Sequence, residues 1–339
     1  MRYVSARQLK PGMVLSNNLY DDNDKVLLKA NTELSQAYIN RIQQMDFDGI
    51  YIFEEGDIET ARQIVSNETR MKAINKLKKL DLNACQFLAN SIVNEIQNAE
   101  SLIVEQMTLS NYDNYTYVHS VNVDVLSVII GIGMGLRNEE LELLSQGAIM
   151  HDIGKCDIPI EIINKPSKLT WDEFEIMKKH PEHGLNRLRE KVKTDGEDVA
   201  AVVKNAVYSH HENWDGSGYP RKLSGEKIHK FARIIHVADV YDALTSKRAY
   251  KDSMNPANAI EYIMANTGTM FDDEVTSVFV KYVAPYPIGC RVLLSNGKQG
   301  VISENNQKQL SRPKVKLDSG TVVDLMNKLD ITILQILNT

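Results

Sequence analysis

The pattern of apolar positions divides the chain into three zones. In the longest, from about residue 57 to 284, apolar residues such as Ile74 and Leu77 recur every three to four positions, with Lys and Arg between them. This spacing is typical of amphipathic helices. Thr170 and Glu173 stand at the spacing of a capping box, which marks a helix start. Because strand-like runs are nearly absent, the pattern predicts an all-helical region.

The N-terminal zone mixes short strand-like runs with turns. An acidic turn separates the runs at 13–20 and 26–28, which predicts a β-hairpin. Ser35–Met45 has the spacing of one short helix, and Gly49–Phe53 has the composition of a closing strand. We therefore predict a small α+β domain at residues 1–56.

The C-terminal zone, residues 285–339, changes pattern again. Pro285 and Pro287 end the helical spacing, because proline removes a backbone donor. Short β-branched runs then alternate with turns: Arg291–Leu294, Gly300–Ile302, Val315–Leu317 and Thr321–Val323. These runs predict a small β module. Its seven Lys and Arg residues against four acids give it a local charge of +3.

Composition narrows the class of protein. The chain has 339 residues and a net charge of −6, so it lacks the basic footprint of a general nucleic-acid binder. Its three cysteines, Cys85, Cys156 and Cys290, form no CxxC pair, which argues against a disulfide framework and favours a reducing compartment. The N-terminus lacks a signal-peptide core, and the apolar run Val125–Leu136 is short for a membrane span. We therefore expect a cytoplasmic protein with no membrane segment.

The histidines are concentrated in one part of the chain, since none of the eight lies in the first 118 or the last 103 residues. His151 and Asp152 end a helical stripe whose earlier members are apolar, so the histidine continues a buried face. Adjacent residues point about 100° apart on a helix. The pair can therefore bind one metal together while the second carboxylate oxygen reaches another. His210, followed by His211, ends a second stripe in the same way.

Three further residues extend this set. His119 opens an apolar helix, and His180 lies at a helix end because Pro181 disfavours helical geometry before it. Asp239 lies within the apolar stretch 234–240, where an uncompensated carboxylate is costly. One histidine on an apolar face is usually a hydrogen-bonded core residue, but the whole set matches two metal ions that share a carboxylate. The histidines expected to lie outside this ligand set are His183, His229 and His236, the last as a neighbour of Asp239.

Three blocks of sequence resemble one known family. They are H-D-I-G-K at 151–155, H-H-E-N-W-D-G-S-G-Y-P at 210–220 and A-D-V-Y-D-A-L-T-S-K-R-A-Y-K at 238–251. In this order they are similar to the HD-GYP family, a branch of the HD metal-dependent phosphohydrolases. The resemblance implies a catalytic domain at 110–284, after a helical linker at 57–109. The predicted fold class is mainly α: a helical HD-type metallohydrolase domain with a small α+β N-terminal domain and a small β C-terminal module.

The resemblance also implies a ligand set. His119, His151, Asp152 and Asp239 look like the ligands of one metal, and Asp152 would bridge to a second held by His180, His210 and His211. Some family members bind a third metal through a Glu four residues before the first ligand histidine, where this chain has Tyr115. A phenol is a poor ligand at neutral pH, so we expect two divalent ions. The resemblance favours iron or manganese, with zinc and nickel as alternatives.

The family activity implied is hydrolysis of cyclic di-GMP to linear pGpG, and in some members on to GMP. Two metals would bind a bridging water, lower its pKa and present hydroxide to phosphorus. Asp152 and Lys155 would be the catalytic residues. The positions that resemble the family's substrate contacts are Lys155, Tyr219, Arg248, Lys251 and, near the guanine, Asp113. Tyr115 leaves the step to GMP open.

The loop Glu212–Gly225 directly follows two predicted ligands. Long loops beside a site are often functional, so we expect it to recognise substrate or to act as a lid. In the family this loop is linked to GGDEF diguanylate cyclases, so a GGDEF-domain protein is a candidate partner through Gly218–Pro220. The flanking domains carry no motif that we recognise. They could regulate, form a homodimer or bind a partner.

Two other interpretations remain open. The substrate could be another cyclic dinucleotide, such as cyclic GMP-AMP, or a nucleotide monoester. Alternatively, the chain could be a non-catalytic receptor for cyclic di-GMP that signals through its flanking domains. Intact ligand positions and Lys155 favour an enzyme.

Overall fold

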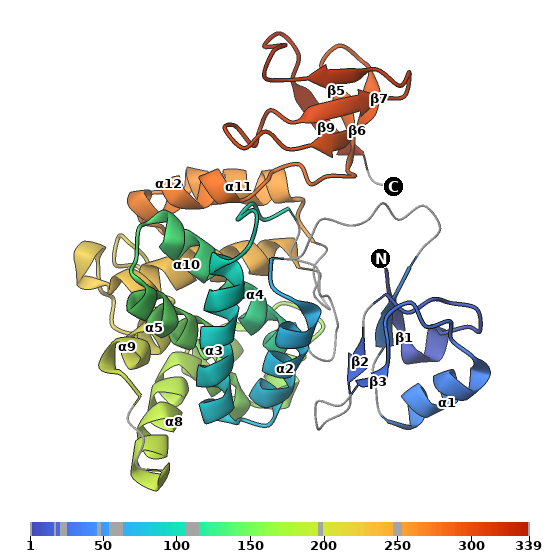
Figure 1. The fold of residues 1–339 in the computed structure, drawn as a ribbon. Helices are drawn as coiled ribbons and strands as arrows, with labels where there is room; N and C mark the ends of the chain where they lie inside the picture. The colour runs from blue at the N-terminus through green and yellow to red at the C-terminus, as the bar shows by residue number, and fades with distance from the viewer. Residues whose placement is uncertain are drawn as a thin grey trace.

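The computed structural model describes residues 2–16, 18–20, 26–45, 49–53, 64–105, 115–195, 199–246 and 253–337. It is mainly helical, with short strands near the N-terminus and a five-stranded sheet near the C-terminus (Figure 1). The predicted fold class is therefore confirmed. Three separate hydrophobic cores lie in these three parts of the chain.

The N-terminal part combines two short strand pairs with one helix. Strand β1 (Arg2–Ser5) pairs antiparallel with β4 (Gly49–Ile52), and β2 (Leu19–Tyr20) pairs with β3 (Val26–Leu28) as the predicted hairpin. A short 3-10 turn, η1 (Ala6–Gln8), follows β1. Helix α1 (Gln36–Gln44) begins after Ser35, whose hydroxyl accepts from the Tyr38 amide at 3.3 Å. The core of this part contains Leu15, Leu34, Ile39, Ile42 and Ile52.

The helical body contains α2 (Asn67–Lys78), α3 (Leu82–Gln97), α4 (Tyr115–Gly133), α5 (Asn138–Ile149), η2 (Ile153–Asp157), α6 (Ile160–Ile163), α7 (Trp171–Met177), α8 (His180–Asp195), α9 (Ala201–Ser209), η3 (Gly225–Lys227), α10 (Lys230–Thr245), α11 (Pro256–Ala265) and α12 (Asp273–Tyr282). The predicted capping box at the start of α7 is present, with Thr170 accepting from the Glu173 amide. Helix α4 contacts α2, α3, α5, α10 and α12 and is the central helix of this body (Figure 1).

Helix α4 is apolar on nearly all sides because it is surrounded by other helices. The stretch Thr116–Gly133 is long and apolar enough to cross a membrane by length and composition, but 78% of it is buried inside the protein. Its buried residues, such as Leu126 and Ile129, pack in the largest core. This helix is therefore the central core helix of the helical body.

Helices α2 and α3 belong to the same core as α4 and α5. Ile74 and Leu77 of α2, and Ile92 of α3, are buried in this core. The Ser145 hydroxyl of α5 also donates to the Ala89 carbonyl of α3 at 3.1 Å. The segment predicted as a linker thus packs on the main helical domain where the structure describes it. The exact domain boundaries stay predictions.

The C-terminal module is an antiparallel sheet of five strands, β5 (Arg291–Leu294), β6 (Gln299–Glu304), β7 (Lys314–Leu317), β8 (Val322–Asp324) and β9 (Ile333–Leu337), in the order β8-β7-β6-β5-β9. Alternate residues of β5 are buried, so one face covers the module's small core. The sequence indicated the first four strands but not β9. Asn305 donates to Glu105 at 3.3 Å, which ties the module to the helical body.

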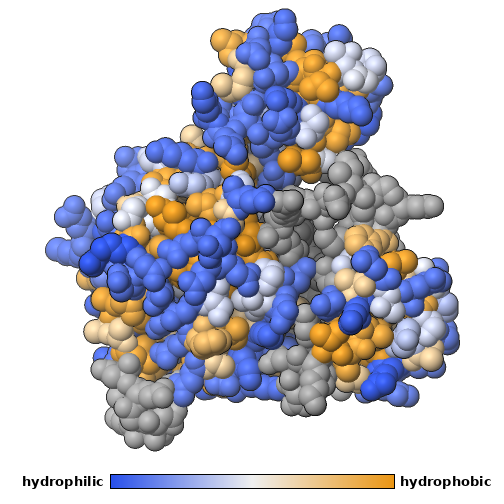
Figure 2. Space-filling model, in the orientation of Figure 1, coloured by the Kyte–Doolittle hydropathy of each residue, from blue (hydrophilic) through white to orange (hydrophobic). Residues whose placement is uncertain are grey.

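The face drawn in Figure 2 is largely hydrophilic, with apolar patches between the polar side chains. Phe87, Trp171 and Leu329 are among the exposed large apolar residues. Scattered exposed apolar residues of this kind are normal on protein surfaces. Most residues of the apolar pattern therefore lie in the three hydrophobic cores.

Candidate metal centre

A close contact between two segments forms the base of the site. His151 and Asp152 follow α5 directly, and η2 begins at the next residue. Gly154 of η2 lies against the backbone of His180 and Gly184 so closely that any Cβ at position 154 would collide with it. Only glycine fits here. The start of α8 therefore lies beside η2, and His180 faces Asp152.

The remaining predicted ligands come from two other helices and one helix end. His119 of α4 and Asp239 of α10 meet where these helices pack, with Nε2 of His119 3.0 Å from Oδ1 of Asp239. His210 and His211 follow α9, and Nδ1 of His211 lies 3.7 Å from Oδ2 of Asp239. Segments far apart in the sequence thus converge on one point.

Asp152 lies at the centre of this arrangement. Its Oδ2 is 3.4 Å from Nε2 of His151 and 3.7 Å from Nε2 of His119. Its Oδ1 is 3.4 Å from Nε2 of His180, which in turn lies 3.2 Å from Nε2 of His210. The two carboxylate oxygens therefore face two different groups of histidines. The structure brings all seven predicted ligands together in this cluster.

The donor atoms fit divalent metal ions. Nε2 of His151 and Oδ1 of Asp152 are buried and have no hydrogen-bond partner among the residues that the structure describes. Nδ1 of three histidines faces a backbone carbonyl: Ala148 O at 2.7 Å for His151, Met177 O at 2.8 Å for His180, and Val207 O at 2.7 Å for His210. A donor Nδ1–H leaves the Nε2 lone pair for a metal. Imidazole and carboxylate ligands suit Fe, Mn, Zn or Ni.

Burial and charge set the protonation of the histidine-rich side. Burial lowers the pKa of His180 to about 4, although the Asp152 carboxylate opposes this shift. Burial also holds the pKa values of His210 and His211 well below the usual range, and the neighbouring histidines add to the effect. These rings are therefore neutral at pH 7, which is the form that binds metals.

On the carboxylate-rich side, neighbouring groups outweigh burial in setting the pKa values. Burial alone would lower the pKa of His119, but hydrogen bonds and charge from Asp239 and Asp242 raise it to about 9. Burial alone would also raise the pKa values of Asp152 and Asp239. Nearby charges, Lys155 and His151 for Asp152 and His119 for Asp239, hold both well below the usual range. This side therefore carries negative charge that favours a cation.

Residues that sequence reasoning missed support His119. Oδ2 of Asp242 lies 2.7 Å from Nδ1 of His119, and Oδ1 of Asp242 accepts from Asn122 at 2.9 Å. Asp242 follows Asp239 by three residues, so both share one face of α10. This three-residue spacing could have indicated Asp242 from the sequence. Asn122 likewise follows His119 by three residues on α4.

The loop Glu212–Gly225 is held in place by a buried carboxylate. Glu212 accepts from the backbone amides of Arg221 at 2.7 Å and Leu223 at 3.0 Å. Gly218 lies against the backbone of Asn213, where no larger residue fits. These contacts fix the loop and hold the Tyr219 ring against His211, with centroids 4.8 Å apart and planes 27° from parallel.

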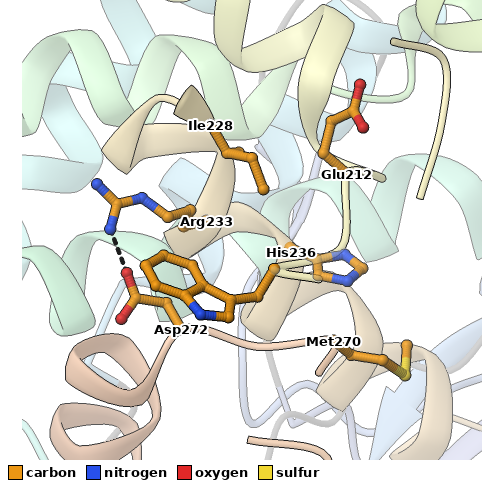
Figure 3. Close-up of a pocket in the computed structure, with 7 residues that line it drawn as sticks. Glu212, Ile228, Arg233, His236, Met270 and Asp272 are labelled. Carbon is orange, nitrogen blue, oxygen red and sulfur yellow. Dashed lines mark hydrogen bonds and ion pairs between the residues drawn. The ribbon is translucent and has the colours of Figure 1, made fainter. Parts of the chain in front are cut away.

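A small pocket beneath this loop shows how it is anchored. Figure 3 shows its lining, which comprises Glu212, Trp214, Ile228, Arg233, His236, Met270 and Asp272. Arg233 forms an ion pair with Asp272, and the Trp214 amide donates to the Met270 carbonyl at 3.0 Å. The Arg233 guanidinium also lies over the Trp214 ring, 5.5 Å from its centre, so the loop is joined to α10 and to the segment that leads into α12. The loop backbone is thus part of the folded core.

The other predicted residues are distributed as follows. Nζ of Lys155 lies 2.5 Å from Oδ2 of Asp152. His236 is buried, with Nε2 3.1 Å from Oδ1 of Asn213, and it lies close to His211 and Asp239. His229 caps α10 by accepting from the Phe231 amide, and His183 is half-buried. Positions outside the described residues are Asp113, Arg248 and Lys251, and the side chain of Tyr115 is not described either.

Phe174 is a further neighbour of the site that the sequence did not indicate. Its ring lies 6.5 Å from that of Tyr219 in an edge-to-face arrangement and is 45% exposed. Nζ of Lys178 lies 5.4 Å from the centre of the Phe174 ring. The rings of His211, Tyr219 and Phe174 therefore follow one another outward, and the Lys178 ammonium lies over the outermost ring.

A helical body around a buried cluster of histidines and aspartates defines a metallohydrolase type of protein. The profile of the HD domain family matches residues 103–275, just over half of the chain. The chain belongs to this family, and its resemblance to the HD-GYP branch is confirmed.

Curated relatives agree with this assignment, and one solved structure shows the same fold. The chain is 38% identical over 233 residues to the cyclic di-GMP phosphodiesterase PA4108 of Pseudomonas aeruginosa, covering 68% of this chain and 55% of that protein. It is 38% identical over 151 residues to the 3'3'-cGAMP-specific phosphodiesterase 2 of Vibrio cholerae, covering 44% and 28%. The chain thus spans about half or less of the length of these relatives. The solved structure of Bd1817, an HDG"Y"P protein from Bdellovibrio bacteriovorus, matches 82% of this chain and 97% of that chain at a TM-score of 0.56 and 19% identity, which shows a shared fold.

Proposed function

We propose that this protein is a metal-dependent phosphodiesterase that hydrolyses cyclic di-GMP to linear pGpG. The observation that carries the proposal is the position of Asp152, whose two oxygens face two different groups of histidines. Such an arrangement suits two ions that share one carboxylate. The similarity to PA4108, a cyclic di-GMP phosphodiesterase, supports the choice of substrate.

The proposed ligands are those of the sequence prediction: His119, His151, Asp152 and Asp239 for one ion, and Asp152, His180, His210 and His211 for the other. When bound, the ions would supply an activated water and positive charge for the attack on phosphorus. The resemblance favours iron or manganese. Because Tyr115 stands where some family members have a third-metal Glu, we propose that pGpG is the main product rather than GMP.

The protein's own groups would orient the phosphodiester. Lys155 is partly exposed, and its Nζ lies beside the central carboxylate, so it can donate to a phosphoryl oxygen placed there. Burial and the carboxylates of Asp239 and Asp152 raise the pKa of Tyr219, so its phenol stays neutral and able to donate a hydrogen bond. The Phe174 ring next to it offers a face for a nucleobase. Arg248, Lys251 and Asp113 complete the proposed substrate contacts.

The test of this function is direct. Purified full chain, loaded anaerobically with Fe(II) or Mn(II), should convert cyclic di-GMP to pGpG, which chromatography separates from GMP. Asp152→Ala should be inactive, whereas His183→Gln, at a half-buried histidine outside the cluster, should keep wild-type activity. A metal-loaded wild type that binds cyclic di-GMP tightly without turnover would instead support the receptor interpretation.

A second candidate substrate is 3'3'-cyclic GMP-AMP, because two similar relatives from Vibrio cholerae are specific for it. The two substrates differ in one base, so the same centre could cleave both. Comparing kcat/KM for the two cyclic dinucleotides, and for a nucleotide monoester, would decide between them. A preference for cyclic GMP-AMP of tenfold or more, about 1.4 kcal/mol in transition-state binding, would replace the first proposal. A GGDEF-domain partner at Gly218–Pro220 and a homodimer stay predictions.

A further inference from the structure

A continuous chain of buried hydrogen bonds leads from helix α2 to the metal centre. Nη2 of Arg70 donates to Oδ1 of Asn122, and Nδ2 of Asn122 donates to Oδ1 of Asp242 at 2.9 Å. Oδ2 of Asp242 then lies 2.7 Å from Nδ1 of His119. The four residues linked by these hydrogen bonds are all buried, with 7% exposure for Arg70 and 1% or less for the other three. This series of hydrogen bonds therefore connects α2, α4 and α10 inside the protein.

The order of donors and acceptors gives this chain a direction. An asparagine amide can be turned either way, but a guanidinium can only donate. Arg70 therefore fixes the oxygen of Asn122 on its own side and turns the amide nitrogen toward Asp242. Asp242 receives a donor on each oxygen and is held against Nδ1 of His119. Because the Nδ1 partner orients a ligand histidine, this arrangement directs Nε2 of His119 toward Asp239.

Arg70 does not lie in the part of the chain that the HD domain profile matches, which begins at residue 103. It belongs to α2, which packs on α3 and α4. We propose that Arg70 is a positioning residue for the metal ligand His119, acting through Asn122 and Asp242. Helix α2 is thus part of the support of the metal centre. This inference concerns metal binding and does not depend on which cyclic dinucleotide is cleaved.

A purely structural role for Arg70 is the competing explanation, because its guanidinium also lies near the buried Asp124. Burial raises the pKa of Asp124 well above its usual range, while a hydrogen bond with Ser145 and the charge of Arg70 oppose this shift. Arg70 donates a hydrogen bond to Asn122, whereas its effect on Asp124 is that of a nearby charge. Asp124→Asn separates a structural role of Arg70 from its positioning role, since it removes the acid and leaves the hydrogen bonds from Arg70 to His119 intact.

The test measures Mn(II) binding by metal-free full chain with calorimetry, alongside the absorption spectrum of the Co(II) form. Arg70→Met should weaken metal affinity roughly 10–100-fold, the usual effect of losing a group that supports a ligand. It should also change the Co(II) spectrum, and Arg70→Lys should recover part of the affinity. Lys72→Met, on the exposed side of α2, and Asp124→Asn should bind as wild type.

Two results would overturn the proposal. One is a folded Arg70→Met protein with wild-type affinity and an unchanged Co(II) spectrum. The other is an Asp124→Asn protein that loses as much affinity as Arg70→Met. If Arg70→Met does not fold, Asn122→Ala interrupts the same chain from α4 and should show the same loss, and wild-type affinity there would equally refute the idea.

A double variant sharpens the test. Because Arg70 and Asn122 act in series, Arg70→Met with Asn122→Ala should lose less affinity than the product of the two single losses. Fully multiplicative losses would contradict a shared pathway. An enzyme that failed to cleave cyclic di-GMP would remove the proposed function but leave these binding measurements interpretable.

Discussion

The two sides of the candidate metal centre are supported in different ways. On one side, Nδ1 of His119 faces the carboxylate of Asp242, and the pKa of His119 is raised to about 9. On the other, Nδ1 of His180 and Nδ1 of His210 face backbone carbonyls, and the pKa of His180 is lowered to about 4. Asp152 faces both sides. One side can therefore be altered through side chains outside the ligand set, whereas the other depends on where helices α8 and α9 begin and end.

The largest effect should come from the residue that both sides share. Asp152→Asn removes the charge between the two groups of histidines, so both sides should lose metal affinity. Phosphodiesterase activity should fall roughly 10³-fold or more, because the metal ions that would stabilise the negative charge of the transition state are lost. Metal content by mass spectrometry and pGpG formation measure this. Asp172→Asn, on the surface of α7, is the matched control, and an Asp152→Asn protein that keeps two metals would refute the shared role.

The next comparison alters one side at a time. Asp242→Asn should weaken metal binding roughly 10–100-fold, because the support of His119 becomes a neutral amide. His210→Ala should instead cost one ion from the other side and leave the His119 side occupied. Stoichiometry and affinity by calorimetry separate the two patterns. Identical losses in both variants would mean that the sides do not act independently.

The pH dependence of stability should show both sides in the metal-free protein. His119 has a folded pKa of about 9, above the unfolded value of about 6.5. Its contribution to stability is complete below pH 6.5 and is lost as pH rises toward 9. His180 has a folded pKa of about 4, so its contribution is lost as pH falls from 6.5 toward 4.

The metal-free protein should therefore be most stable near neutral pH, as judged by urea unfolding between pH 4 and pH 9. Asp242→Asn should reduce the loss on the alkaline side only. Metal binding should release the proton from His119, so the apparent affinity should rise with pH, by up to about tenfold per unit, until pH 9. A metal affinity that is flat between pH 7 and pH 9 would contradict the protonation of His119.

The smallest effect is expected at the edge of the site. Tyr219→Phe keeps the ring that stacks on His211 and removes only the hydroxyl. If the phenol donates to substrate, kcat/KM should fall by a few-fold, about 1 kcal/mol for one neutral hydrogen bond, with metal content unchanged. Steady-state kinetics on metal-loaded protein measure this. Loss of metal would show that Tyr219 supports the centre rather than the substrate.

The sequence indicated the candidate ligands through the family resemblance and because several of them break a local rule. His151 and His210 extend apolar stripes, and Asp239 places a charge within an apolar helix. Such departures from pattern can be seen without knowing the fold. The sequence also indicated the helical body, the N-terminal hairpin and four strands of the C-terminal sheet from their periodicity.

What the sequence did not indicate depends on contacts between distant segments. Arg70 resembles any other basic residue on an amphipathic helix until α2 packs on α4. Glu212 resembles a surface acid until the loop folds back over it. The sequence did not indicate strands β1 and β9, whose pairing with β4 and β5 is decided by tertiary structure. Propensity alone is a weak guide at such positions.

The anchoring of the loop by Glu212 has a consequence for how specificity could change. The loop backbone is fixed by the Glu212 carboxylate, which accepts from two loop amides, and by Gly218, which has no side chain. The exposed side chains of the loop, such as that of Lys222, can then be exchanged on a constant scaffold, whereas the Tyr219 ring stays stacked on His211. New nucleotide preferences could be selected from a library of loop side chains without rebuilding the metal centre, provided that the two anchors are kept.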